Sequence, residues 1–196
     1  MTDTLNVIAI CGSLRKGSFN AMLAGSLPAL APSTMTIAAA PSIGSMPLYN
    51  FDVQQEHGFP APVLALYDAI RAADGVILVT PEYNYSVPGV LKNAIDWVSR
   101  VPNQPFLNKP VAIQSASPSA LGGARAQYHL RQMLVFLDAF VFNKPEIMVA
   151  FVNTKVDEAK AEVTDEPTRE IIRQHLAGFA KFILRVNRGS SSAPGR

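Results

Sequence analysis

Residues 5–11 read LNVIAIC, and residues 12–20, which follow directly, read GSLRKGSFN. The first stretch is a continuous run of mainly apolar and β-branched side chains, which is typical of a strand buried on both faces of a parallel sheet. The second stretch is polar and contains two glycines, and Ser18 is a suitable N-cap for a helix that begins behind it. A buried strand, a polar loop and a helix in this order predict the first unit of an α/β fold.

The rest of the chain repeats this alternation. We expect further strands at residues 34–39, 75–80 and 109–115, and a fifth within 141–149. We expect helices at residues 18–30, 62–73, 87–100, 125–140 and 166–188. Strands that are separated by helices pair in parallel through right-handed crossovers. The sequence therefore predicts a doubly wound, five-stranded parallel sheet with helices on both faces.

Composition and charge limit the classes of protein to which the chain can belong. The chain has 196 residues, of which 48% are hydrophobic and 16% charged, so we expect one globular domain over residues 1–188 and a disordered tail at 189–196. The net charge is +2 and no stripe of Lys and Arg is present, which disfavours nucleic acid as a partner. No apolar run is long enough to span a bilayer. A single cysteine and an N-terminus without a basic region predict a cytoplasmic protein.

The loop after the first strand is suited to a phosphate group. A helix N-terminus offers free backbone N–H groups and partial positive charge, Ser13 and Ser18 add hydroxyls, and Arg15 adds a permanent cation. A Walker A loop is excluded because Ser18, not lysine, follows Gly17, and the three-glycine dinucleotide fingerprint is incomplete. A capped helix after a tight turn, without any ligand, is the alternative.

The loop after the third expected strand, residues 80–89, reads TPEYNYSVPG. Its two tyrosines, its amide side chain and its prolines make a stiff segment that can present aromatic faces and backbone groups to a flat heterocycle. The alternative is a rigid turn with surface tyrosines. In open parallel sheets, ligands bind beyond the carboxyl ends of the strands, where both of these loops lie.

These two loops carry a family resemblance. GSLRKGSFN and PEYNYS resemble the two FMN-binding motifs of the NADPH-dependent FMN reductase family, within which the likeness is to bacterial chromate and quinone reductases, and it extends over residues 5–188. The resemblance implies a flavodoxin-like three-layer fold with strand order 2-1-3-4-5 and noncovalently bound FMN. It places the phosphate contacts on Ser13, Arg15, Ser18, Phe19 and Asn20. It places the contacts to the ring and ribityl chain on Pro81, Glu82, Tyr83, Asn84 and Tyr85, with Ser117 at the flavin edge.

The same resemblance implies the chemistry. The nicotinamide of NADPH or NADH gives a hydride to flavin N5 and leaves. The acceptor then binds in the place of the nicotinamide, which is a ping-pong scheme, and the acceptors are quinones, chromate, azo dyes and free flavin. No protein group is required as a catalytic residue, and His57, His129 and His175 are too scattered in the sequence to suggest a metal site. We interpret Glu82 as positional, with proton transfer as the alternative.

Two other function classes stay open. A flavodoxin-like electron carrier would bind flavin without turnover of its own, but flavodoxins are typically strongly acidic and this chain is slightly basic. A phosphate-binding transferase would use the first loop without any flavin.

Apolar helices also suggest self-association. The expected helix at 87–100 carries a second apolar row of Val90, Ala94 and Trp97 that continues to Val101, and the helix at 125–140 has little polar face. A helix that is apolar on most sides is usually buried, so we predict a subunit interface, which the family resemblance supports with dimers and, in the chromate-reductase branch, tetramers. A deeper core within one subunit is the alternative.

Overall fold

The parallel sheet is built around its first strand. In the computed structural model, β1 (Leu5–Cys11) pairs in parallel with β2 (Met35–Ala39) on one side and with β3 (Gly75–Thr80) on the other. β4 (Pro110–Ala116) pairs with β3, and β5 (Phe140–Val141) with β4, which gives the order β2-β1-β3-β4-β5. The structure describes the backbone of residues 4–191 and the side chains of residues 4–188. The predicted flavodoxin-like order is confirmed.

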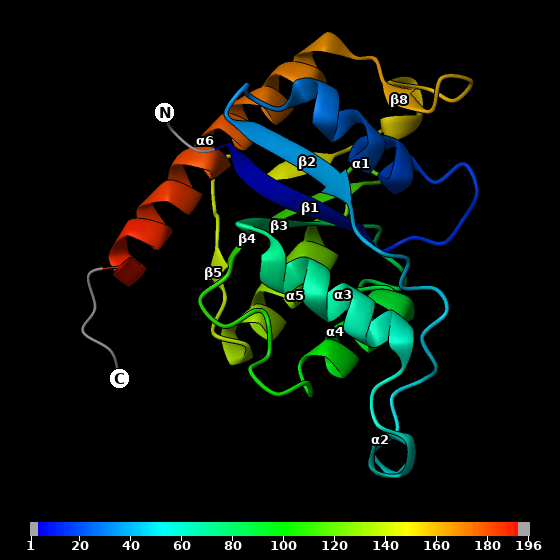
Figure 1. The fold of residues 1–196 in the computed structure, drawn as a ribbon. Helices are drawn as coiled ribbons and strands as arrows, with labels where there is room; N and C mark the ends of the chain where they lie inside the picture. Colours follow the sequence, from blue (N-terminus) through cyan, green and yellow to red (C-terminus); the bar gives the residue numbers. More distant parts are fainter. Residues whose placement is uncertain (1–3, 192–196) are drawn as a thin grey trace.

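The helices form a layer on each face of the sheet (Figure 1). One layer contains α1 (Phe19–Leu30) and α6 (Glu166–Ser191), and the other contains α3 (Ala61–Ala72), α4 (Gly89–Val98) and α5 (Ala124–Phe136). The side chains of β3 alternate between the two cores. Val76 and Leu78 pack with α3, α4 and α5, whereas Ile77 and Val79 pack with α1 and α6. This two-sided burial explains why β3 is continuously apolar.

The fifth strand is broken into two pieces. β5 pairs with the beginning of β4 and β6 (Ile147–Val149) pairs with its end, and the chain between them passes through Pro145. Proline has no N–H to donate to a strand ladder, so a continuous strand is not available there. The predicted helix at 125–140 was too long, because α5 ends at Phe136 and the chain turns through Asp138, at φ 54°, into β5.

Several short elements were not predicted from the sequence. These are α2 (Phe51–His57), a 3₁₀ turn at Val152–Thr154, and a hairpin of β7 (Val156–Asp157) and β8 (Glu162–Val163). The last helix extends to Ser191, three residues beyond the expected end at 188, and residues 192–196 of the expected tail lie outside the described residues. No helix within residues 4–191 is both long and apolar enough to cross a membrane.

The second apolar row of α4 is covered within the same chain. Trp97 is fully buried, and its ring meets Tyr49 edge-on at 5.0 Å between centroids. The centre of the Phe59 ring lies 6.5 Å from that of Trp97, and the Trp97 indole N–H donates to the carbonyl oxygen of Pro47 at 2.8 Å. The segment before α3 therefore provides the cover, and the expectation that this row needs a second subunit is wrong for Trp97.

Candidate cofactor site

Three loops at the carboxyl ends of β1, β3 and β4 enclose a cavity of about 150 Å³. Nine of the eleven predicted site residues line it, and Ala116 and Pro118 complete the wall. The nine are Ser13, Arg15, Ser18, Phe19, Asn20, Pro81, Glu82, Tyr83 and Ser117. Asn84 and Tyr85 do not line the cavity and lie further along the second loop. The fold thus brings residues from three separate loops to one place.

The first loop presents a helix N-terminus to this cavity. Ser18 is the N-cap of α1, where its Oγ accepts from the N–H of Ala21 at 3.3 Å, and this confirms the predicted cap. The first turn of α1 contains no acidic side chain, so its positive end is not neutralised locally. Arg15 is exposed, with its guanidinium 5.5 Å from the centre of the Phe19 ring. This combination of helix terminus and exposed cation suits a phosphate group.

Asn20 connects the first loop to the third. Its Nδ2 donates to the carbonyl oxygen of Ala116 at 2.9 Å, and its Oδ1 accepts from the Ala116 N–H at 2.9 Å. The side chain is buried, at 3% exposure, so both bonds are shielded from water. Asn20 therefore fixes the end of β4 against the start of α1, a role that the sequence did not indicate. Its contact with a phosphate stays a prediction.

The second loop is a tight reversal. Tyr83 and Ser86 exchange two backbone hydrogen bonds, each of 3.0 Å, and the two residues between them, Asn84 and Tyr85, have φ of 49° and 65°. Positive φ at both central residues is the type I′ pattern, which is unfavourable for a bulky side chain such as tyrosine. The turn leaves Tyr83 48% and Tyr85 65% exposed. Tyr83 thus presents an exposed aromatic side chain at the cavity, whereas Tyr85 lies further along the loop.

A salt bridge locks this loop to the start of α5. The Glu82 carboxylate accepts from the Nε of Arg125 at 2.6 Å and from the backbone N–H groups of Arg125 and Ala126 at 2.9 and 3.2 Å. Burial opposes ionisation of Glu82, but the hydrogen bonds from Arg125 and Ala126 outweigh it and hold the pKa below its usual value. Glu82 is therefore a carboxylate with its oxygens engaged, which favours the positional interpretation over proton transfer.

Two positioning residues were missed by the sequence analysis. The guanidinium of Arg125 lies 3.5 Å from the centre of the Tyr85 ring, and His129 Nδ1 is 2.9 Å from the Ser86 hydroxyl. Both residues belong to α5 and both hold the second loop. Their position at the start of the helix that follows the third loop was the available signal, because that helix begins at the same edge of the sheet.

The third loop is held by its own contacts and by backbone hydrogen bonds to residues 149–152, where the N–H of Ser117 donates to the carbonyl oxygen of Val149 at 3.0 Å. The Ser117 hydroxyl accepts from the N–H of Ser119 at 3.1 Å and lies 3.0 Å from the Ser119 hydroxyl. Gly123, at φ 90°, passes so close to Ser115 that an added Cβ would lie 2.8 Å from the serine Cβ. This close approach requires glycine and sets where α5 begins. Among the described residues, no group of three or more His, Cys, Asp or Glu side chains is placed to hold a metal ion.

Known proteins are similar to this chain in sequence. The family model for NADPH-dependent FMN reductases matches residues 5–154. The chain is 58% identical over 186 residues to a quinone reductase of Escherichia coli (strain K12), and the matched region covers 95% of this chain and 99% of that protein. It is 48% identical over 186 residues to an NAD(P)H-dependent FMN reductase of Pseudomonas aeruginosa, with the same coverage of 95% and 99%.

A solved structure agrees with these similarities in sequence. FerB, a flavoenzyme NAD(P)H:(acceptor) oxidoreductase from Paracoccus denitrificans, has a TM-score of 0.83 and is 34% identical, over 93% of this chain and 98% of that chain.

Proposed function

Because this chain belongs to the NADPH-dependent FMN reductase family, we propose that the cavity between its three loops holds FMN, with the phosphate at the N-terminus of α1 and the ring beside Tyr83 and Tyr85. The protein is an FMN-dependent NAD(P)H oxidoreductase that reduces quinones. Bound FMN supplies the capacity to take a hydride from the nicotinamide and pass electrons to the acceptor. The work of the chain is to hold FMN and to leave one face of it accessible.

One observation carries the assignment of the site. The residues that the two motifs select converge on a single cavity although they come from separate loops, and that cavity combines an arginine, hydroxyl groups and an uncompensated helix N-terminus. Arg15 and the N–H groups of the first turn of α1 bind and orient the phosphate. The strained turn at Asn84 and Tyr85, fixed through Glu82 and Arg125, orients the ring.

A comparison of two neighbouring cations tests this site. Arg15→Ala removes a charge-assisted hydrogen bond, so FMN affinity should fall by about 1.5–3 kcal/mol, or roughly 10- to 150-fold. Lys16→Ala removes the adjacent exposed cation, which does not line the cavity, and should change affinity much less. Fluorescence titration of the apoprotein with FMN measures both. Equal losses in the two variants would show that Arg15 acts through long-range charge and does not touch the phosphate.

The range of acceptors is part of the proposal. Tyr83 and Tyr85 are exposed, so bound FMN beside them would be accessible to chromate, azo dyes and free flavin as well as quinones, and to either NADPH or NADH as donor. Steady-state kinetics with both donors and a panel of these acceptors decides the preference. A single acceptor class with measurable turnover would contradict the open-face interpretation.

We also propose that the protein forms a homodimer or homotetramer and that it works in the cytoplasm. Residues 1–188 of each chain form one domain. The end of α5 leaves Val135 77% and Phe136 82% exposed, and Phe140 is 42% exposed beside them in sequence. Adjacent exposed apolar side chains of this size are typical of an interaction surface. The packing of α1 and α6, from opposite ends of the chain, into one core supports a single domain.

A further inference from the structure

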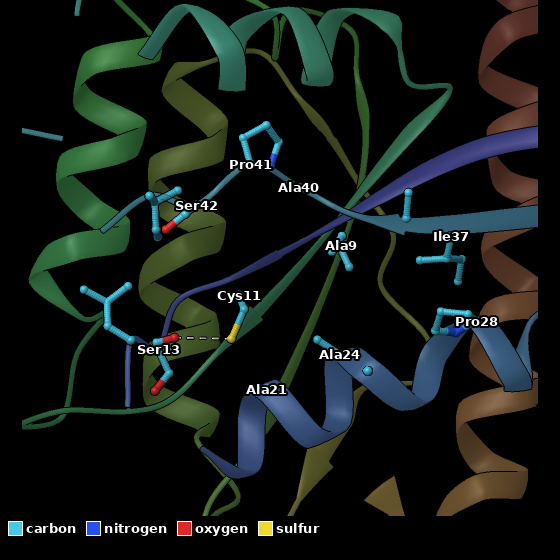
Figure 2. A pocket seen from close by; sticks show the side chains of 15 residues that line it. Ala9, Cys11, Ser13, Ala21, Ala24, Pro28, Ile37, Ala40, Pro41 and Ser42 are labelled. Atoms are coloured by element: carbon cyan, nitrogen blue, oxygen red, sulfur yellow. Dashed lines mark hydrogen bonds between the residues drawn. The ribbon is translucent and has the colours of Figure 1, made fainter. Parts of the chain in front are cut away.

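A second cavity, of about 340 Å³, lies between α1 and the outer edge of the sheet. Its floor is formed by β1 and β2, and residues 40–43 close it opposite α1 (Figure 2). It offers about the room that ten water molecules take in the liquid, at ~30 Å³ each. That space suits one molecule of one or two fused six-membered rings.

The cavity exists because the facing side chains are small. Ala21 and Ala24 on α1 face Ala9 and Ala39 on the strands, and a Cβ added to Gly25 would meet no atom within 4 Å. Larger side chains at these positions would fill the gap, as they do along the rest of the α1 interface, where Leu23 and Leu27 are fully buried. Unfilled space forgoes the dispersion contacts that a bound molecule would supply.

The lining fixes the chemistry of a ligand. No charged side chain lines the cavity, and burial raises the pKa of the Cys11 thiol, so the thiol is uncharged at neutral pH. A charged ligand would gain no charged partner here. Polar groups lie toward one end, and Figure 2 shows Cys11, Ser13 and Ser42 on the opposite side of the view from Pro28 and Ile37.

We propose that this cavity is a binding site for a small, uncharged, mainly aromatic or alicyclic molecule that carries a hydroxyl or carbonyl oxygen at one end. The oxygen lies toward Ser42, and the rings lie against Ile37 and the alanines of α1. The site is separate from the FMN cavity, which Arg15 and Tyr83 line. The two cavities share one wall residue, Ser13.

Cys11 provides a site-specific reporter, because it is the single cysteine of the chain and lines this cavity. The test uses the full FMN-loaded chain, 2-naphthol as the probe, and the rate at which N-ethylmaleimide modifies the thiol. At ten times its dissociation constant, 2-naphthol should slow the modification about tenfold. No slowing up to the solubility limit of 2-naphthol would overturn the proposal.

Paired variants separate this site from binding on the flavin. Ala24→Leu fills the cavity from α1, whereas Ala29→Leu makes the same change at an exposed position of the same helix that does not line it. Protection by 2-naphthol should persist in Ala29→Leu and disappear in Ala24→Leu. Gly25→Leu, which also improves helix propensity, should behave as Ala24→Leu does. Equal protection in all variants would place the probe elsewhere and refute the proposed site.

Discussion

Replacing Glu82 by glutamine should destabilise the protein markedly while leaving its shape intact. The carboxylate is 9% exposed and accepts from two backbone N–H groups at the start of α5 and from the guanidinium of Arg125. Glutamine keeps one oxygen but points an amide donor at groups that are themselves donors. Both backbone N–H groups donate to Oε2 and the guanidinium donates to Oε1, so a glutamine that keeps its oxygen toward the backbone leaves the Arg125 guanidinium facing an amide donor, without its acceptor.

The expected loss is about 2 kcal/mol. A hydrogen bond to a charged group contributes about 1.5–3 kcal/mol, and breaking a buried ion pair costs about 3–5 kcal/mol. The lower range applies because the Arg125 side chain is 36% exposed, so water replaces part of what it loses. The pKa of Glu82 is lowered in the folded protein, so its contribution is complete above the usual carboxyl pKa and is lost as the pH falls through the folded value.

Urea unfolding of the apoproteins at pH 7 measures this loss without linkage to FMN. Glu146→Gln is the matched control, because it makes the same change where the carboxylate is 33% exposed and lies 3.7 Å from Arg131. The control should lose less than about 1 kcal/mol. The difference between wild type and Glu82→Gln should shrink below about pH 4, near the usual carboxyl pKa. Equal losses in the two variants, or a difference independent of pH, would refute the reasoning.

Three further outcomes are expected. Asn20→Ala should cost about 1–3 kcal/mol in urea unfolding and weaken FMN binding as well, since the buried N–H and C=O of Ala116 lose their partner; unchanged FMN affinity would separate the two roles. Burial lowers the pKa of His175 to about 4, so as the pH falls the unfolded chain binds a proton before the folded chain does. Up to about 3 kcal/mol of the free energy of unfolding is therefore lost between pH 6.5 and pH 4, and His175→Gln should abolish this loss. Phe136→Ser should shift sedimentation toward smaller species, whereas Leu48→Ser, at an equally exposed position, should not, and identical sedimentation would remove α5 from the proposed interface.

The sheet order and the motif loops were predictable because their signals are local. Runs such as residues 75–79 are apolar since both faces of β3 are covered, and the polar stretches that interrupt such runs mark the edge where ligands bind. A hydroxyl residue just before an apolar helix was enough to place the N-cap at Ser18.

What the sequence did not reveal depends on contacts between distant residues. Nothing beside Trp97 in the sequence indicates that Pro47, Tyr49 and Phe59 cover it, so the apolar row was assigned to a subunit interface. Glu82 and Arg125 are likewise 43 residues apart in the sequence. The periodicity of apolar residues predicts the helix that carries Arg125, but it does not predict that this helix lies against the loop that carries Glu82. The sequence predicted one strand within residues 141–149. The structure has two short strands there, β5 and β6, which both pair with β4.

The bond pair between Asn20 and Ala116 has a consequence for how the enzyme is made. The two residues are 96 positions apart, so a ribosome that adds about 5–20 residues per second completes the second partner roughly 5–20 s after the first. Until then, the N-terminal loop has no anchor for its buried amide. Loading of FMN therefore belongs to the later part of synthesis, and a nascent chain that ends before β4 should not retain the flavin.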